Sequence, residues 1–242
     1  MIDCIIPARA GSKGIPKKNI VLIENVPLIA YSIFVASQSE NIKNVYVSTD
    51  SEEIAEIANF YGAKTPFLRP KYLASDKASD KQVFVHFFEE SLKLNLNISN
   101  AVAHLRPTTP GRNVEIIDQA ILDFSSNKAC TSMRSAHLAD YHPHKWFNLD
   151  GEYFTPLIKS ISSIEITNLP RQTFPKVYIP NGYVDIVKYS TFKNEGIFHG
   201  NKTKSFLTEP VVDIDKNIDL NKAKNDLDVK KLSVLIKKKY SF

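Results

Sequence analysis

The chain has 242 residues, of which 43% are hydrophobic, enough for one sizeable core or for one core with a small appendage. It contains no apolar run of the roughly 18 residues that a membrane span requires, so no membrane partner is expected. The first residues lack the basic leader of a secretory signal, which favours a cytoplasmic protein. The net charge of +5 comes mainly from cations in the first loop and near the C-terminus, without interleaved aromatic residues, so no nucleic-acid partner is expected.

The first apolar run, Ile2 to Ile6, breaks at Pro7 and predicts a buried strand of a parallel sheet. The loop that follows combines small residues with four cations; these are Ala8, Ala10, Gly11, Ser12 and Gly14, and Arg9, Lys13, Lys17 and Lys18. Successive backbone N–H groups in a loop of small residues form a concavity for anions, and the cations favour a phosphate-rich ligand. The sequence therefore predicts a phosphate-binding loop, with a basic surface turn as the alternative.

Neither GxxxxGK[ST] nor GxGxxG is present in this loop. Instead, the motif Pro7-Ala-Arg9-x-Gly11-Ser-Lys13-Gly14-Ile-Pro16-x-Lys18-Asn19 closely resembles the signature of the N-acylneuraminate cytidylyltransferases, the CMP-sialic acid synthetases. The related CMP-Kdo synthetases typically carry Arg-Leu-Pro-Gly-Lys-Pro where this chain has Lys13 to Asn19. The resemblance implies that the loop holds a nucleoside triphosphate and that Asn19 contacts its ribose.

Helical and strand-like segments alternate after the loop. A helix is expected from Pro27, a strand over 44–50 and a helix over 51–61, whose apolar residues recur at helical spacing before a C-terminal cap at Gly62. This alternation predicts an α/β fold with a mostly parallel sheet, whose ligands bind beyond the carboxyl ends of the strands. The resemblance implies the Rossmann-like nucleotide-diphospho-sugar transferase fold.

Segment 67–80 reads as a loop before a helix over 81–94, with Ser79 or Asp80 as its N-cap. In the resembled family the matching segments wrap cytosine and ribose, which places Arg69 on the base and Asp80 in the nucleotide site.

A buried strand over 101–105 ends in Arg106-Pro107-Thr108-Thr109-Pro110-Gly111-Arg112 and is followed by a helix over 114–124. This stretch resembles the family's LQPTSPLR, which faces nucleotide and sugar. Arg106 replaces the usual Gln, and an Arg can bind a carboxylate or a phosphate through two hydrogen bonds. The alternative for Arg112 is a solvated residue of the following helix.

A further strand is expected over 128–133, before the composition changes over about 137–179 to His, Pro and aromatic residues. A hairpin is predicted at Asp150-Gly151. The resemblance implies one domain over 1–242 in which 137–179 is an extension that pairs two subunits of a homodimer. Lys145 and Arg171 would then meet the sugar or the nucleotide across the dimer; the alternative is plain surface cations.

Pro180-Asn181-Gly182 precedes a strand over 183–187 and matches the family's PNG, with a simple turn as the alternative. By the resemblance, Asn181, Tyr183 and Phe198 contact the sugar.

Asp213 and Asp215 lie two residues apart in an expected strand, so both carboxylates point to one face. Two adjacent like charges favour a cation between them, and oxygen ligands suit Mg²⁺. The family holds its catalytic metal on such an Asp-x-Asp. The alternative is a helix cap, for which Asp219 is the better candidate.

The resemblance implies a cytidylyltransferase that converts CTP and a nonulosonic acid into a CMP-sugar and pyrophosphate with Mg²⁺. The expected catalytic residues are Arg9, Lys18, Asp213 and Asp215. The expected nucleotide site comprises Ala8, Arg9, Ala10, Gly11, Ser12, Lys13, Lys18, Asn19, Arg69 and Asp80. The expected sugar site comprises Arg106, Pro107, Thr108, Thr109, Lys145, Arg171, Asn181, Tyr183 and Phe198. The alternatives are a CMP-Kdo-type synthetase and a catalytically silent nucleotide-binding module on the same fold.

Overall fold

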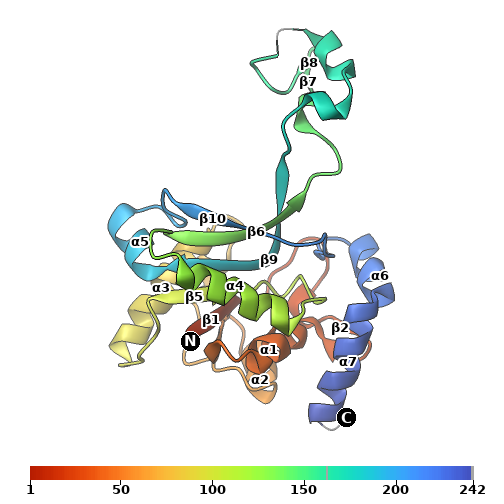
Figure 1. The fold of residues 1–242 in the computed structure, drawn as a ribbon. Coiled ribbons are helices and arrows are strands. Elements are labelled where there is room, and N and C mark those ends of the chain that lie inside the picture. The colour runs from red at the N-terminus through yellow and green to blue at the C-terminus, as the bar shows by residue number, and fades with distance from the viewer. Residues whose placement is uncertain (162, 241–242) are drawn as a thin grey trace.

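A computed structural model describes residues 1–161 and 163–240 of the chain. Its centre is a six-stranded sheet in the order β10-β6-β9-β5-β1-β4 (Figure 1). The strands are β1 (Ile2–Pro7), β4 (Ile42–Ser48), β5 (Ala101–His104), β6 (Ser132–Leu138), β9 (Tyr178–Lys188) and β10 (Thr203–Leu207). β9 runs antiparallel to β5 and β6, and the other pairings are parallel, which confirms the mostly parallel sheet.

Helices cover both faces of the sheet (Figure 1). They are α1 (Leu28–Gln38), α2 (Glu52–Phe60), α3 (Asp80–Lys93), α4 (Val114–Ser126), α5 (Tyr189–Glu195), α6 (Asn217–Asn225) and α7 (Leu227–Tyr240). Successive residues of β1 alternate between two apolar clusters, with Cys4 and Ile6 in one and Ile5 in the other. β1 is therefore buried on both faces, as its mostly apolar sequence predicts, in which Asp3 is the charged exception.

Capping residues set the helix boundaries that the sequence predicts. Ser51 accepts a hydrogen bond from the Ile54 N–H and begins α2, and Gly62 follows that helix with a φ of +88°. Ser79 and Gln82 form a capping box that begins α3. The two cysteines, Cys4 and Cys130, are buried and free, and burial raises the pKa of Cys4 to about 12.

Several predicted elements differ from the structure. The strand expected over 128–133 begins only at Ser132. Pro180 to Gly182 do not form a separate turn but lie within β9, where the register with β6 shifts and Gly182 adopts a φ of +65°. Residues 211–215 form no strand, because their backbone crosses from β10 to α6 without a neighbouring strand to pair with.

The C-terminal helix expected after Asp219 is two helices, α6 and α7. Asp219 lies in the first turn of α6, and its carboxylate accepts hydrogen bonds from the N–H groups of Asp215 and Lys216. It therefore caps the helix from inside rather than preceding it. Burial of Ile236 and Val229 on α7 completes the core beside α1.

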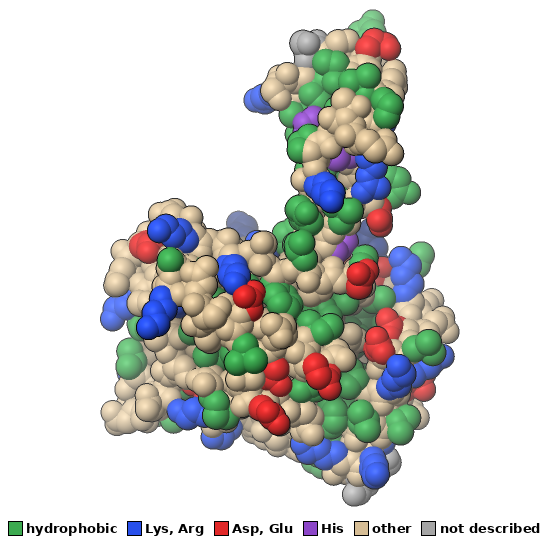
Figure 2. All heavy atoms as spheres, in the orientation of Figure 1, with side chains coloured by type: hydrophobic (Ala, Val, Ile, Leu, Met, Phe, Trp, Pro, Cys, Tyr) green, Lys and Arg blue, Asp and Glu red, His purple; other side chains and the backbone are tan. Residues whose placement is uncertain are grey.

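The ends of β6 and β9 continue away from the body into a projection of residues 139–177, which we call the arm (Figure 1). It contains the antiparallel hairpin of β7 (Phe147–Asp150) and β8 (Tyr153–Pro156), which turns at Gly151 with a φ of +60°, as the sequence predicts. Hydrophobic side chains are spread over its surface (Figure 2). Those exposed include Tyr141, Trp146, Phe147, Leu149, Tyr153 and Phe154. In the described part of the chain, no helix has both the length and the apolar character needed to cross a bilayer.

Candidate functional site

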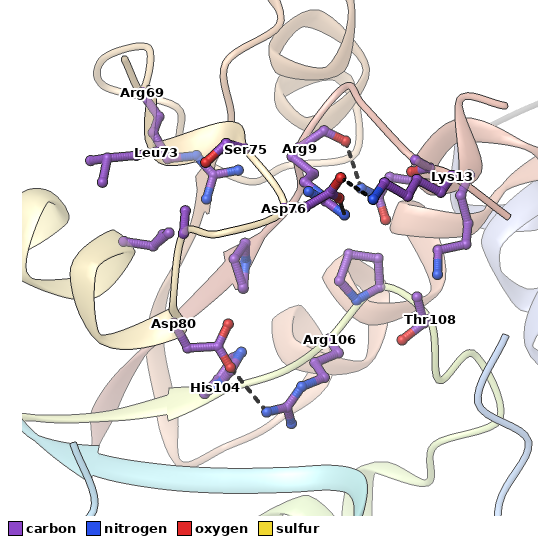
Figure 3. A pocket seen from close by; sticks show the side chains of 17 residues that line it. Arg9, Lys13, Arg69, Leu73, Ser75, Asp76, Asp80, His104, Arg106 and Thr108 are labelled. Atoms are coloured by element: carbon purple, nitrogen blue, oxygen red, sulfur yellow. Dashed lines mark hydrogen bonds and ion pairs between the residues drawn. The ribbon is translucent and has the colours of Figure 1, made fainter. Parts of the chain in front are cut away.

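A cavity of about 310 Å³ opens beyond the carboxyl ends of β1 and β5 (Figure 3). It is lined by Pro7, Arg9, Ser12, Lys13, Lys18, Asn19, Arg69, Leu73, Ser75, Asp76, Ala78, Asp80, Val83, His104, Arg106, Pro107 and Thr108. The segments that build it are the loop after β1, the loop before α3 and the loop after β5. This is the edge of the sheet at which the sequence places a ligand.

The loop after β1 is fastened to the end of β4. The Ala8 N–H donates to the Ser48 carbonyl at 2.9 Å, and the Ala10 N–H donates to the Asp50 carboxylate at 2.8 Å. These two N–H groups are therefore not free donors for a phosphate. Gly14 has a different role from the one expected, because a Cβ there would lie 2.3 Å from the backbone oxygen of Asp215. The glycine permits close packing of two backbone segments.

Two cations of this loop converge on one acid. Asp76 lies 2.8 Å from the Arg9 guanidinium and 2.7 Å from the Lys13 ammonium (Figure 3). Hydrogen bonds from Lys13 and then Arg9 lower the pKa of Asp76. Asn19 donates to the Arg9 carbonyl at 2.9 Å and so fixes the backbone that carries this guanidinium. Sequence reasoning missed Asp76, although an acid in the segment between Arg69 and Asp80 was a signal for it.

The third cation, Lys18, reaches the C-terminal part of the chain. It begins the short 3₁₀ helix η1 (Lys18–Ile20), and its ammonium lies 2.8 Å from the Asp215 carboxylate. Lys17, the fourth cation, pairs with Glu53 on α2 instead and does not line the cavity. Three of the four cations thus face one space, which is an arrangement suited to a polyphosphate.

The opposite wall of the cavity is more apolar and contains a buried arginine. Leu73, Ala78 and Val83 supply the apolar surface. Arg69 is only 5% exposed, and its Nε has no hydrogen-bond partner among the residues that the structure describes. Burial lowers the pKa of Arg69. A guanidinium held against an apolar wall is able to donate to the carbonyl of a planar ring.

Arg106 closes the cavity on the side of β9. Its guanidinium lies 3.2 Å from Asp80 (Figure 3). It also lies 3.0 Å from Asp185, a carboxylate that is buried in β9. His104 lies below it, fully buried, and burial lowers its pKa well below the usual value, so the ring is neutral at pH 7. Neither Asp185 nor His104 was expected at the site.

Comparison with known proteins identifies this architecture. The family model described as Cytidylyltransferase matches residues 4–144, and a post-translational flagellin modification protein B of Campylobacter coli is 34% identical over 98% of this chain and 96% of its own length. The chain belongs to the cytidylyltransferase family.

Other members of the cytidylyltransferase family match over shorter stretches. A pseudaminic acid cytidylyltransferase of Campylobacter jejuni is 44% identical over 52% of this chain and 54% of its own length. An N-acylneuraminate cytidylyltransferase of Escherichia coli is 32% identical over 92% of this chain and 51% of its own length. The chain thus spans about half the length of these two relatives.

The fold agrees with solved structures of nucleotidyltransferases. A CMP:2-keto-3-deoxy-manno-octonic acid synthetase complexed with CTP superimposes with a TM-score of 0.68, covering 93% of this chain and 97% of that one, at 15% identity. At this identity the likeness concerns the fold alone.

The structure brings ten of the predicted site residues of this cytidylyltransferase to the cavity. They are Arg9, Ser12, Lys13, Lys18, Asn19, Arg69, Asp80, Arg106, Pro107 and Thr108. Ala8, Ala10 and Gly11 belong to the same loop but do not line the cavity.

Four residues predicted to contact the sugar lie elsewhere, because they serve the fold. Thr109 is fully buried. Asn181 donates to the Thr208 hydroxyl at 2.7 Å, and the buried Tyr183 accepts a hydrogen bond from the Asn113 N–H at 2.6 Å. Phe198 packs its ring on Phe84, at 5.2 Å between centroids.

Lys145 and Arg171, the two cations predicted to act across a dimer, lie on the arm and not at the cavity of their own chain. Arg171 donates to the Ala139 carbonyl within the arm. Their predicted role therefore requires a second subunit.

The sequence leaves open whether Arg112 belongs to the site or is solvated. In the structure it neither lines the cavity nor contacts solvent to any appreciable extent. It is 1% exposed and donates to a ring of acceptors beneath the loop after β5. Those acceptors are the carbonyls of Arg106, Thr109, Gly182 and Tyr183 and the hydroxyl of Ser32. Burial lowers the pKa of Arg112 to about 10, so the side chain stays charged at pH 7.

Asp213 and Asp215 are exposed on either side of Ile214, which is fully buried and donates its N–H to the Thr108 carbonyl at 2.8 Å. Asp215 is joined to the cavity through Lys18. Within 1–161 and 163–240, no group of three or more His, Cys, Asp or Glu side chains is placed to hold a metal ion. Without the expected strand, the two carboxylates are not aligned on one face by strand geometry. Carboxylates suit Mg²⁺, which proteins commonly bind through one or two of them together with substrate phosphates and waters.

Proposed function

We propose that this protein transfers the cytidylyl group of CTP to a nonulosonic acid, giving a CMP-sugar and pyrophosphate. The observation that carries the proposal is the cavity itself, where Arg9, Lys13 and Lys18 face one space beside the apolar wall with Arg69. Membership of the cytidylyltransferase family supports it, as do relatives that are named for pseudaminic, legionaminic and N-acylneuraminic acids.

In this proposal the protein works by positioning and by neutralising charge. Arg9, Lys13 and Lys18 hold the triphosphate and stabilise the negative charge that grows on the departing pyrophosphate. Asp76 then gives up its pairing with Arg9 and Lys13, because a triphosphate carries more charge than one carboxylate. Arg69 holds the base by donating to a ring carbonyl. The anomeric hydroxyl of the acceptor attacks the α-phosphorus in line with the leaving group.

Mg²⁺ is the proposed cofactor, with Asp213 and Asp215 as its protein ligands. When bound, it would neutralise phosphate charge and lower the pKa of a bound hydroxyl. The Lys18–Asp215 ion pair supports this placement, because it joins the acidic pair to a cation of the phosphate site.

A CMP-Kdo-type synthetase is the less favoured reading. The solved CMP:2-keto-3-deoxy-manno-octonic acid synthetase is 15% identical to this chain, whereas the relatives named for pseudaminic, legionaminic and N-acylneuraminic acids are 29–47% identical over their aligned stretches. A catalytically silent module is also disfavoured, because Arg9, Lys13 and Lys18 all face the cavity.

The test is pyrophosphate release with CTP and a panel of N-acetylneuraminic, legionaminic and pseudaminic acids, with Kdo as a control. We expect one nonulosonic acid to support turnover at least about tenfold faster than Kdo at equal concentration, and chelation of Mg²⁺ with EDTA to abolish that turnover. No release with any of these acids from protein that still binds CTP would contradict the proposed function.

We also propose a homodimer in which the arm of one subunit reaches the cavity of the other. The arm exposes aromatic residues that a monomer leaves in water, including Trp146, Tyr153 and Phe154. It also has a groove of about 430 Å³ whose lining includes His142, Arg171 and Phe174. Aromatic side chains that are exposed in one subunit and become buried on assembly are typical of subunit interfaces.

Mixing two inactive variants tests this shared site. A Lys145→Ala subunit carries a defective arm and an Arg9→Ala subunit a defective cavity, so a mixed dimer retains one intact site. Random exchange of equal amounts should restore about a quarter of the wild-type rate, since half of the dimers are mixed and each has one working site. The same mixture with Arg171→Ala should behave alike. If subunit exchange is demonstrated and the mixture still shows no recovery of activity, a role of the arm in the partner's site is excluded.

A further inference from the structure

A second polar cluster adjoins the cavity on the face of the sheet that α3 and α5 cover. His104 on β5 lies directly opposite Asp185 on β9, which lies directly opposite Arg134 on β6. Residues directly opposite one another in adjacent strands share a face, so the three side chains form one row across the sheet. Arg106, from the loop after β5, joins this row from the cavity side (Figure 3).

Asp185 lies between two guanidiniums. Its side chain is 1% exposed, with one carboxylate oxygen 3.0 Å from Arg106 and the other 3.6 Å from the Nε of Arg134. The distance to Arg134 is that of an ion pair and is too long for a hydrogen bond. A buried carboxylate needs such partners, and it holds both cations in place in return.

The cluster gathers buried polar atoms that have no hydrogen-bond partner in the described structure. They are both ring nitrogens of His104, one oxygen of Asp185, the Nε of Arg134 and the Nδ1 of His199. His199 lies in the loop after α5, near enough to Arg134 and Asp185 for their charges to affect its pKa. Native proteins leave few such atoms, so a group of them beside a cavity indicates partners that a ligand or its waters supply.

The charge of the cluster resides on its arginines. Burial lowers the pKa of both His104 and His199, so these rings are neutral at pH 7. The single negative charge of Asp185 neutralises only one of the two guanidinium charges. The remaining acid is Asp80, whose side chain is 46% exposed and lies 3.2 Å from Arg106, so that contact is open to exchange with a second carboxylate.

We propose that Arg134, together with Arg106, binds the carboxylate of the acceptor sugar acid, and that Asp185 is the positioning residue that sets the two guanidiniums side by side. The inference rests on the proposed function. It adds the side chains with which the protein distinguishes a sugar acid from a neutral sugar. The acceptor carboxylate takes the place of Asp80 on Arg106 and meets Arg134 from the open side. His104 and His199 supply neutral hydrogen-bonding groups to the same ligand.

The experiment compares the acid that the wild type turns over best with its methyl ester, which lacks the negative charge. We expect the wild type to favour the acid in kcat/KM by about 100-fold or more, since two charge-assisted contacts are involved. Arg134→Gln should lower this preference by about 10-fold or more through a higher KM for the acid, while the KM for CTP changes less than twofold. Arg134→Lys should recover part of the preference, because it restores the charge but not the fork.

Lys204→Gln is the matched control. Lys204 lies directly opposite Met133 on the same strand pair, so it occupies the other face of the sheet, and it pairs with Asp123 outside the cavity. It should leave the preference for the acid unchanged. Asp185→Asn should raise the KM for the acid as Arg134→Gln does. If this buried substitution prevents folding, the result for Arg134, whose side chain is 36% exposed, decides the matter alone.

The outcomes separate the two proposals. An unchanged preference in Arg134→Gln, with active wild type, overturns the role of Arg134 and leaves the cytidylyl transfer standing. An equal change in Lys204→Gln overturns it as well. A wild type that turns over no sugar acid removes the proposed function and this inference together.

Discussion

The Arg9→Ala variant is expected to fold like the wild type and to release pyrophosphate from CTP about 100- to 1000-fold more slowly. Arg9 lies in the loop directly after β1, and its side chain lines the cavity. Its guanidinium contacts Asp76 and the Ala74 carbonyl. Both contacts are partly exposed, so their loss should leave the melting temperature close to that of the wild type. Steady-state kinetics with a thermal melt of the same sample measures both effects.

Lys17→Ala is the control for Arg9→Ala. It removes a cation from the same loop, but one that pairs with Glu53 at 2.7 Å outside the cavity. It should retain turnover within a few-fold of the wild type. A large fall in the melting temperature of Arg9→Ala, or equal turnover losses in both variants, would show that the loop cations serve the fold and not the phosphates.

The Arg112→Met variant is expected to lose about 3–5 kcal/mol of unfolding free energy. The guanidinium is 1% exposed and donates to four carbonyls and one hydroxyl. Methionine fills much of the space but leaves these buried acceptors without donors, which is the costly part of the change. Urea unfolding followed by circular dichroism measures the difference.

Lys43→Met is the matched control, since Lys43 is exposed on the edge strand β4, and its effect should stay within about 0.5 kcal/mol. Arg112→Lys should recover little stability, because a single ammonium cannot reach acceptors arranged around a planar fork. An Arg112→Met variant as stable as Lys43→Met would mean that the acceptors find other donors.

The sequence predicts those parts of the fold that depend on local pattern. The largely apolar run of β1 and the glycine after α2 each predict one element, and the structure has both; the cap that the sequence leaves open between Ser79 and Asp80 is Ser79. The loop after β1 was predictable for the same reason, because small residues and cations directly after a buried strand have few other uses.

Features that depend on contacts between distant segments were not predictable. Nothing near Arg112 in the sequence shows that carbonyls from β9 surround it. Tyr183, which is predicted to contact the sugar, is buried in the core and does not line the cavity. The face of β9 on which it lies depends on an irregularity in the pairing with β6, which the sequence does not reveal. Asp185 and Arg134 have no sequence signal at all, since only the order of the strands brings them together.

The contact between Gly14 and Asp215 joins the first loop of the chain to a segment made some two hundred residues later. During synthesis the first strand can form early, but its loop lacks the backbone against which it packs until Asp215 has left the ribosome. The stretch that matches the family model ends at residue 144 and therefore contains the cations of the phosphate site without the segment that shapes it. The loop after β1 therefore reaches its final packing only after the residues around Asp215 have been made.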